Sequence, residues 1–409
     1  MLTYWAQVLH FYQPPTQTHE ILERVTNESY RPLLGVLREH PEARVAVNMN
    51  AVLTQMLVEH GLRDVVDCLR GLAERGQVEF VGSGRYHPIL PLIPESERRR
   101  SVTENAQLNR EFFGSSYEPR GFFPPELCYS DAITDAVTSS GHEWLLLSGV
   151  ACPGEWKVAE VARIAAGAGQ TRVLFRDDGR SNQISFRETT AAAFVAGLGP
   201  VARDGDAYVL TAMDAETYGH HIAGWEREFL AAAYDEVEKA ENASVRMVQP
   251  SELLDLFPAG PVIEPHASSW STTRDDIAAK NPYPLWHAPE DEVHALQWEY
   301  VEHCLDLLTT ARRYAAVKSE SGRFAVLAGD ALQPALHSCQ FWWASGRPMW
   351  DVAMVLRGLQ LLTTVLVYAT RSVEVGEAAA DVKRQARWRV AAANEARIRL
   401  ERLLMERTA

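Results

Sequence analysis

The chain has 409 residues, of which 46% are hydrophobic and 9% aromatic, and its formal net charge is −14. A chain of this length can bury a large core, and it is long enough for two or three domains or for one barrel with an appendage. The acidic balance argues against nucleic-acid binding, which needs a basic surface. It is compatible with a neutral polyol substrate.

The cysteines and the N-terminus indicate a cellular setting. The five cysteines are odd in number and contain no C-x-x-C pair, so we expect reduced, mostly buried thiols and no disulfide framework. Residues Met1 to Phe11 lack the basic start and long apolar core of a signal peptide. No segment is predicted to reach transmembrane length. We therefore expect a cytoplasmic protein with no nucleic-acid partner and no membrane partner.

Short apolar runs alternate with amphipathic stretches over residues 1–288. The predicted strands are Trp5–Leu9, Arg44–Asn48, Val78–Val81, Gly121–Phe123, Trp144–Leu147, Tyr208–Met213 and Val245–Val248. The predicted helices between them are Ile21–Glu39, Leu53–His60, Leu62–Arg75, Glu95–Phe113, Asp131–Ser139, Glu226–Ala240 and Ser251–Leu256. This alternation predicts parallel strands covered by helices. About seven strands, with Arg172–Phe175 assigned to a side hairpin, suggest an incomplete or distorted barrel.

The strand signal fades after about residue 288. Four segments have the 3.6-residue periodicity of helices: Glu292–Thr310, Arg323–Leu336, Trp350–Tyr368 and Val382–Met405. The sequence therefore predicts a barrel domain over residues 1–288 and a C-terminal helical domain over residues 289–409 that contributes to the cleft.

Two carboxylates stand where predicted strands end. Glu126 follows Gly121–Phe123 and two prolines that fix the backbone before it. Asp214 closes the run Tyr208–Met213. The residues at the C-terminal ends of strands build the active site of a barrel enzyme, and a carboxylate pair is what glycoside hydrolysis requires. The alternatives are that Glu126 starts a helix and that Asp214 makes an Asx turn.

Histidines and one further glutamate lie near the same breaks. His10 and His87 each precede prolines, and either ring nitrogen can hydrogen-bond a sugar hydroxyl. Glu216 lies two residues after Asp214, and we expect it to support Asp214 and not to react. A metal site built from His10, His87, Asp214, His220 and His221 is an alternative. No H-x-H or H-x-x-x-H spacing supports it, so no metal and no cofactor is predicted.

Tryptophans in loop-like sequence are candidates for sugar stacking. They are Trp270, Trp286, Trp342 and Trp343. Aromatic faces stack on the apolar faces of pyranose rings, although large aromatic side chains also pack the interface between a barrel and a helical bundle.

Taken together, these segments resemble glycoside hydrolase family 57, which contains α-amylases, 4-α-glucanotransferases and branching enzymes. All five motifs of the family have counterparts here, in order. They are His10-Phe-Tyr-Gln-Pro, Gly82–Pro91, Gly121-Phe-Phe-Pro-Pro-Glu126, Met213-Asp-Ala-Glu-Thr-Tyr-Gly-His220 and Ser338-Cys-Gln-Phe-Trp-Trp343. Five ordered motifs are far more specific than any one of them.

The resemblance implies an incomplete (β/α)₇ barrel with a C-terminal α-helical domain and a retaining, metal-independent mechanism. Glu126 would be the nucleophile and Asp214 the general acid/base. The substrate-binding residues would be His10, Gln13, His87, Glu216, His220, Trp270, Trp286, Trp342 and Trp343. Position 87 carries His where transferase-type members tend to carry Glu, which favours the hydrolase-like or uncharacterised branch.

The expected substrate is an α-glucan or maltooligosaccharide, cleaved at α-1,4 or α-1,6 bonds. Water or a sugar hydroxyl could accept the glucosyl unit, so hydrolase and transglycosidase remain alternatives. An α-galactosidase differs from them by a few hydrogen bonds. Two further classes are a metal-dependent deacetylase or mannosidase on a related barrel, and a non-catalytic glucan-binding protein. The second of these would be expected to lack Glu126 or Asp214.

Overall fold

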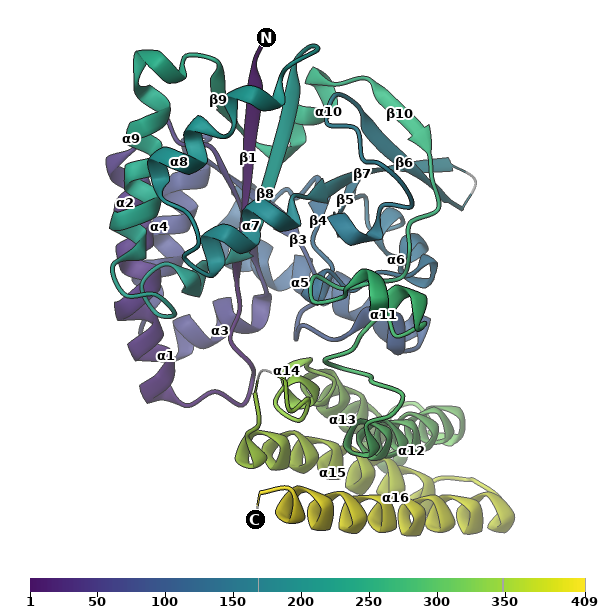
Figure 1. Cartoon of the computed structure of the whole chain (residues 1–409). Helices are drawn as coiled ribbons and strands as arrows, with labels where there is room; N and C mark the ends of the chain where they lie inside the picture. Colours follow the sequence, from purple (N-terminus) through teal and green to yellow (C-terminus); the bar gives the residue numbers. More distant parts are fainter. Residues whose placement is uncertain (168, 348, 409) are drawn as a thin grey trace. The chain divides into compact units, whose positions relative to one another are not determined.

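A curled, mainly parallel sheet organises the N-terminal part of the chain (Figure 1). The computed structural model describes residues 1–167, 169–347 and 349–408. These residues form two compact units, Met1–Ile277 and Ala278–Ala409. The first unit therefore ends somewhat before the boundary at residue 288 that the sequence suggested.

Seven parallel strands form the main path of the sheet in the spatial order β7-β5-β4-β3-β2-β1-β8. Their bounds are β1 Thr3–Phe11, β2 Val45–Met49, β3 Val78–Gly82, β4 Gly121–Phe122, β5 Trp144–Ser148, β7 Gly169–Arg176 and β8 Ala207–Asp214. Each run of apolar residues is buried on both faces, as parallel strands covered by helices require. The expected incomplete (β/α)₇ barrel is confirmed.

The prediction was wrong about which run supplies the seventh strand. Arg172–Phe175 was assigned to a side hairpin, but β7 pairs in parallel with β5 and belongs to the main sheet. It also makes a hairpin with the antiparallel strand β6 (Val161–Ala166), against which β10 (Ala259–Val262) pairs. The predicted strand Val245–Val248 is β9, which pairs only with the start of β1 and lies off the main path.

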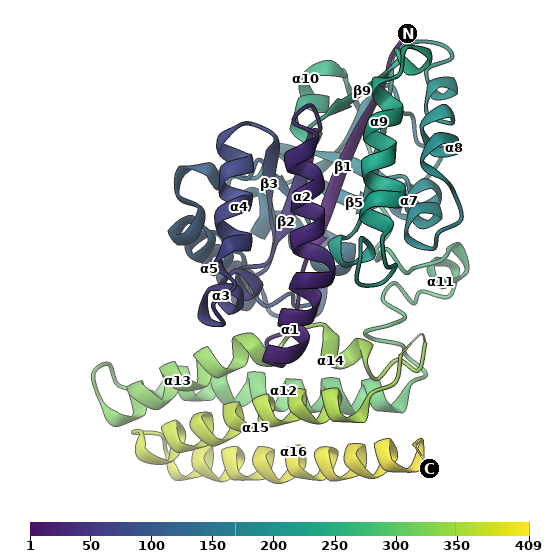
Figure 2. The same cartoon turned by 90° about the vertical axis from the view of Figure 1, so that its left-hand side faces the viewer.

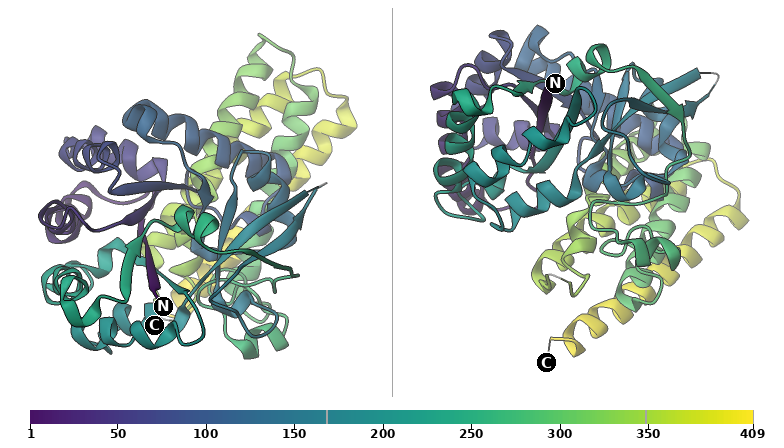
Figure 3. Two further views of the ribbon diagram at one scale, coloured as in Figure 1. Left: turned by 90° about the horizontal axis from the view of Figure 1, so that it is seen from above. Right: turned by 45° about the horizontal axis from the view of Figure 1, so that its top comes forward.

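Helices surround the outside of the curled strands, as the view from above in Figure 3 shows. Those of the first unit are α1 His19–Val25, α2 Arg31–Glu39, α3 Ala51–Glu59, α4 Arg63–Glu74, α5 Glu95–Phe113, α6 Thr134–Thr138, α7 Asp178–Ser185, α8 Ala191–Ala196, α9 Ala232–Glu238, α10 Leu253–Leu256 and α11 Arg274–Ala278. The helix expected over Ile21–Glu39 is present, and it continues from α1 to α2 through a π-helical turn at Thr26–Tyr30.

The second unit is a helical bundle, as expected (Figure 2). Its helices are α12 Glu292–Tyr314, α13 Glu320–Ala335, α14 Cys339–Trp342, α15 Val352–Val375 and α16 Ala380–Glu406. By length and composition α15 could cross a membrane, so the expectation that no segment reaches that length was wrong. A core helix of a bundle meets the same criterion, and α15 packs against α12, α13 and α16.

All five cysteines are free thiols, as expected. Two of the five, Cys128 and Cys304, are buried and the other three are partly exposed, so the expectation of mostly buried thiols was wrong.

Candidate active site

Along neighbouring strands the inward-facing residues are apolar until the C-terminal edge of the sheet, where they become polar. On β8, Ala212 belongs to the buried core, and Asp214, two residues later, continues the same face. On β1, Val8 belongs to the core and His10 continues its face. His10 and Asp214 are register partners between these paired strands. Strand alternation therefore brings these two predicted site residues side by side.

The carboxyl group of Asp214 has an environment that favours its protonated form. The residue is partly exposed, but its carboxyl group lies among protein atoms, and this burial raises its pKa. The charges of His10 and Arg176 act in the opposite direction and limit the rise. Burial disfavours the carboxylate and nearby cations favour it. Asp214 is thereby suited to give up and take back a proton.

His10 is held in one tautomer by Asn48, its register partner on β2. The side-chain amide of Asn48 donates to the carbonyl oxygens of Val81 and Gly82, 3.1 and 3.3 Å away, which turns its Oδ1 toward His10. The Nδ1–H of His10 donates to that oxygen across 2.6 Å. Burial lowers the pKa of His10, opposed by Asp214 and Asn48. A neutral ring with a free lone pair on Nε2 is the state that these contacts favour.

The backbone at Glu126 is unusual. Glu126 has φ 59° and ψ 18°, and Leu127 after it has φ 49°. Two successive non-glycine residues in the left-handed region are uncommon and cost free energy, as is often found at functional sites. The consequence is that Glu126 does not continue into a helix N-terminus, and a short 3₁₀ turn, Pro125–Leu127, carries it instead.

Glu126 lies among other predicted site residues. The side chain is 13% exposed, and its Oε1 is 3.5 Å from Nδ1 of the fully buried His87. The backbone N–H of Trp270 donates to the carbonyl oxygen of Glu126 across 3.1 Å. The indole ring of Trp270 contacts His10 and Phe123 edge-on, with centroids 5.9 and 5.8 Å away.

A ladder of stacked rings joins the two sides of the site. His10 stacks on Phe123 and on His87, with centroids 4.8 Å apart in both cases. His87, whose φ is 57°, stacks on Tyr12 at 4.0 Å. These stacks connect the surroundings of Asp214 with those of Glu126.

Glu216 is buried and held by two hydrogen-bond donors. Only 4% of the residue is exposed. Its Oε1 accepts hydrogen bonds from the amide of Gln13 at 3.1 Å and from the hydroxyl of Tyr30. Burial and the charge of Asp214 raise the pKa of Glu216, against the effect of these hydrogen bonds. The π-helical turn after α1 ends at Tyr30, so this irregular turn supplies one of the two donors that hold Glu216.

The other predicted binding residues are placed differently. The ring of His220 is paired through Nδ1 with Oε2 of Glu28 at 2.6 Å, near the surface of the first unit. Trp286 in the second unit is fully buried. Trp342 and Trp343, also in the second unit, are partly exposed, with rings 4.9 Å apart.

Sequence reasoning missed Tyr30, Asn48 and Arg176. Asn48 ends a predicted strand and Arg176 directly follows an apolar run, so the rule that picked out Asp214 would have found both. Tyr30 gave no comparable signal, because its inward position depends on the π-helical turn.

A metal centre has no counterpart in the described residues 1–167, 169–347 and 349–408, where no group of three or more His, Cys, Asp or Glu side chains could hold a metal ion. The ligand set considered from the sequence is divided, because His220 is paired with Glu28.

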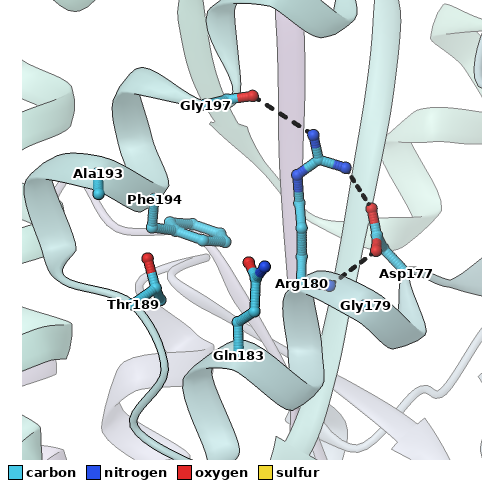
Figure 4. A pocket seen from close by; sticks show the side chains of 8 residues that line it. All are labelled: Asp177, Gly179, Arg180, Gln183, Thr189, Ala193, Phe194 and Gly197. Atoms are coloured by element: carbon cyan, nitrogen blue, oxygen red, sulfur yellow. Dashed lines mark hydrogen bonds and ion pairs between the residues drawn. The ribbon is translucent and has the colours of Figure 1, made fainter.

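A hollow separate from these residues lies between α7 and α8 (Figure 4). It is lined by Asp177, Gly179, Arg180, Gln183, Thr189, Ala193, Phe194 and Gly197. The guanidinium of Arg180 donates to Asp177 at 2.6 Å and reaches the carbonyl oxygen of Gly197 at 3.4 Å. The charge of Arg180 is thus already matched, and none of the predicted site residues lines this hollow.

The parallel strand order and the polar groups at the strand ends place the chain among the incomplete (β/α)₇ barrels. The family described as Glycosyl hydrolase family 57 matches residues 5–264, and the chain belongs to this family. The resemblance seen in the motifs is thus confirmed.

Three relatives illustrate the likeness. An α-amylase of Pyrococcus horikoshii is 32% identical over 139 residues, which cover 34% of this chain and 21% of that protein. The structure of a 4-α-glucanotransferase from Thermococcus litoralis has a TM-score of 0.71 at 18% identity, covering 91% of this chain and 60% of that one. A branching enzyme structure from Pyrococcus horikoshii has a TM-score of 0.70 at 14% identity, covering 95% and 94%. The chain thus spans about a fifth of the length of the curated amylase that it matches.

Proposed function

We propose that this chain is a retaining glycoside hydrolase that cleaves α-glucosidic bonds of α-glucans or maltooligosaccharides. The observation that carries the proposal is the pair of carboxyl groups in different settings. Glu126 is fixed by a left-handed backbone beside His87. Asp214 lies at the end of β8, where burial raises its pKa. A double displacement requires one carboxyl group that gives its proton to the leaving group and a second carboxylate that attacks the anomeric carbon.

In the first step Asp214 gives its proton to the glycosidic oxygen while a carboxylate oxygen of Glu126 attacks the anomeric carbon. The bond from that carbon to the leaving oxygen breaks, and a covalent glycosyl-enzyme forms. In the second step Asp214, now a carboxylate, takes a proton from the acceptor hydroxyl. The acceptor oxygen bonds to the anomeric carbon, and Glu126 leaves.

The neighbouring residues support substrate binding in this proposal. His10 presents an unprotonated Nε2 as an acceptor for a sugar hydroxyl, because Asn48 holds the proton on Nδ1. Glu216, two residues after Asp214, is held in place by hydrogen bonds from Gln13 and Tyr30. The ring of Trp270, close to His10, offers an apolar face to a pyranose.

The substrate class is supported by the relatives, which are named α-amylase and 4-α-glucanotransferase. Both names refer to α-glucans but differ in the acceptor. Transglycosylation is therefore the second candidate, on the same two carboxyl groups.

The test is a product profile. The purified protein is incubated with maltoheptaose, with and without a chelator, beside Asp214→Asn and the matched variant Asp204→Asn, whose aspartate is exposed. Shorter products alone, unaffected by chelator and absent with Asp214→Asn, are expected for a hydrolase. Products both longer and shorter than seven units indicate a transglycosidase. No product, or full activity of Asp214→Asn, refutes the proposal.

A further inference from the structure

The inward face of β7 ends in a buried arginine. Leu174 belongs to the core of the first unit, and Arg176, two residues later on the same face, is only 4% exposed. A fully charged side chain in such a position needs partners for its donors. The groups that contact the guanidinium therefore indicate the role of its charge.

Three acceptors fix the guanidinium of Arg176. Its Nε donates to the carbonyl oxygen of Ala212 at 2.8 Å, Nη1 to Oδ1 of Asp178 at 2.8 Å, and Nη2 to Oδ1 of Asn182 at 2.9 Å. Two of these acceptors come from α7, and the third comes from β8. Arg176 therefore has one orientation, set by the helix that follows its own strand.

The bond to Ala212 joins strands that the sheet does not pair. β7 and β8 are not neighbours in the strand order, so this side of the barrel has no continuous ladder. The Arg176 side chain crosses there and binds the backbone two residues before Asp214. The guanidinium is thereby anchored to β8 two residues before Asp214, and its charge acts on the Asp214 carboxyl group.

Four groups around Asp214 can carry charge or a proton. Arg176 comes from β7, His10 from β1, Glu216 from the turn after β8, and Tyr30 from the π-helical turn. Burial favours the neutral form of the other three, whereas a guanidinium stays protonated at any working pH. Arg176 is therefore the permanent positive charge among these four.

The balancing anion of Arg176 is itself engaged elsewhere. Oδ2 of Asp178 accepts from the hydroxyl of Ser148 at 2.8 Å and from the backbone N–H of Val150 at 3.0 Å. The guanidinium also lies 6.0 Å from the ring centroid of Trp270, whose backbone N–H binds Glu126. Arg176 thus has contacts on both sides of the proposed reaction centre.

We propose that Arg176 is a positioning residue that stabilises the Asp214 carboxylate formed when the leaving group takes its proton, and so sets the pH range in which Asp214 works as acid and base. This inference rests on the proposed function of the same site. Arg176 itself does not exchange a proton or touch the reacting atoms.

The sign of the effect follows from electrostatics. The cation stabilises the charged form of Asp214, so its removal makes the carboxylate less favourable and raises the pKa of Asp214 further. Asp214 then keeps its proton to higher pH. The alkaline limb of kcat/KM, which reports the acid in the free enzyme, moves to higher pH. We expect a shift of roughly one pH unit, the lower end of the effect of a nearby opposite charge.

The test compares Arg176→Gln with Arg172→Gln, which makes the same change in the middle of β7, where Arg172 donates to the carbonyl oxygen of Leu254. The pH profile of kcat/KM on maltoheptaose should shift upward for Arg176→Gln and not for Arg172→Gln. An unshifted alkaline limb in Arg176→Gln, or an equal shift in both variants, overturns the inference.

A measurement that needs no turnover separates this inference from the proposed function. In protein labelled with ¹³Cγ-aspartate, the signal missing from Asp214→Asn identifies Asp214, and its titration is followed in the wild type and in Arg176→Gln. An upward shift supports the inference even if the wild type acts on no α-glucan, and an unchanged titration refutes it even if the enzyme is active. If Arg176→Gln does not fold, the double variant Arg176→Gln/Asp178→Asn removes the unmatched carboxylate and is titrated in its place.

Discussion

The backbone at Glu126 gives a prediction that separates stability from activity. With φ 59° and ψ 18°, this position suits glycine, whereas any residue with a Cβ pays about 1–2 kcal/mol there. Glycine loses more chain entropy on folding, which offsets about 0.4–1 kcal/mol of that gain. We therefore expect Glu126→Gly to be more stable than Glu126→Ala by about 1 kcal/mol. In a unit of this size the difference corresponds to a melting temperature higher by about 2–4 °C.

The assay is thermal or urea unfolding of both variants, which equally lack the carboxylate. The matched control is the same pair at Glu104, inside helix α5, where glycine should be less stable than alanine by about 1 kcal/mol. If Glu126→Gly is also less stable than Glu126→Ala, position 126 does not have a left-handed backbone. Both variants at position 126 should be inactive on maltoheptaose and should form an inverted glycosyl azide when azide is added.

Three further predictions concern single groups. Asp214→Asn should lower kcat on maltoheptaose by about 10²–10⁴-fold, the contribution of a general acid, and an unchanged kcat contradicts the assignment. Burial raises the pKa of Glu79 from 4.5 to about 7, so folding stability should fall as pH rises from 4.5 to 7, by about 3 kcal/mol in total. In urea unfolding, the stability of Glu79→Gln should not fall over this pH range. The same pH dependence in the wild type and in Glu79→Gln would refute the role of Glu79. Gly121→Ala should strongly destabilise the fold, because its Cβ would lie 2.1 Å from the ring of Trp144, whereas Gly71→Ala in α4 meets nothing within 4 Å and should be tolerated in thermal unfolding.

Apolar runs predicted the strands well but did not predict their partners. Arg172–Phe175 and Val245–Val248 are runs of equal length, and nothing local distinguishes the one that joins the main sheet. The difference lies in long-range pairing, since β7 follows the full length of β5, whereas β9 meets only the start of β1.

The site was predictable where it depends on strand alternation. His10 and Asp214 end apolar runs on paired strands, so their polar character at those places pointed to the carboxyl ends of the sheet. The left-handed backbone of Glu126 was not predictable, because Pro-Pro-Glu is equally typical of a helix start. The hydrogen bond from Tyr30 to Glu216 also escaped prediction, since it needs a π-helical turn to direct the phenol inward. The expectation that the C-terminal helices contribute to the cleft stays a prediction.

The most direct test of the account is to identify the residue that becomes covalently linked to sugar. The wild-type protein is incubated with a 5-fluoro-α-maltosyl fluoride, whose fluoride leaves without an acid and whose ring fluorine slows release of the intermediate, and is then digested and analysed by mass spectrometry. The account predicts a fluoromaltosyl group on Glu126, and no label in Glu126→Ala. A label on Asp214 or Glu216, or hydrolysis to the inverted anomer with no labelled peptide, would contradict it.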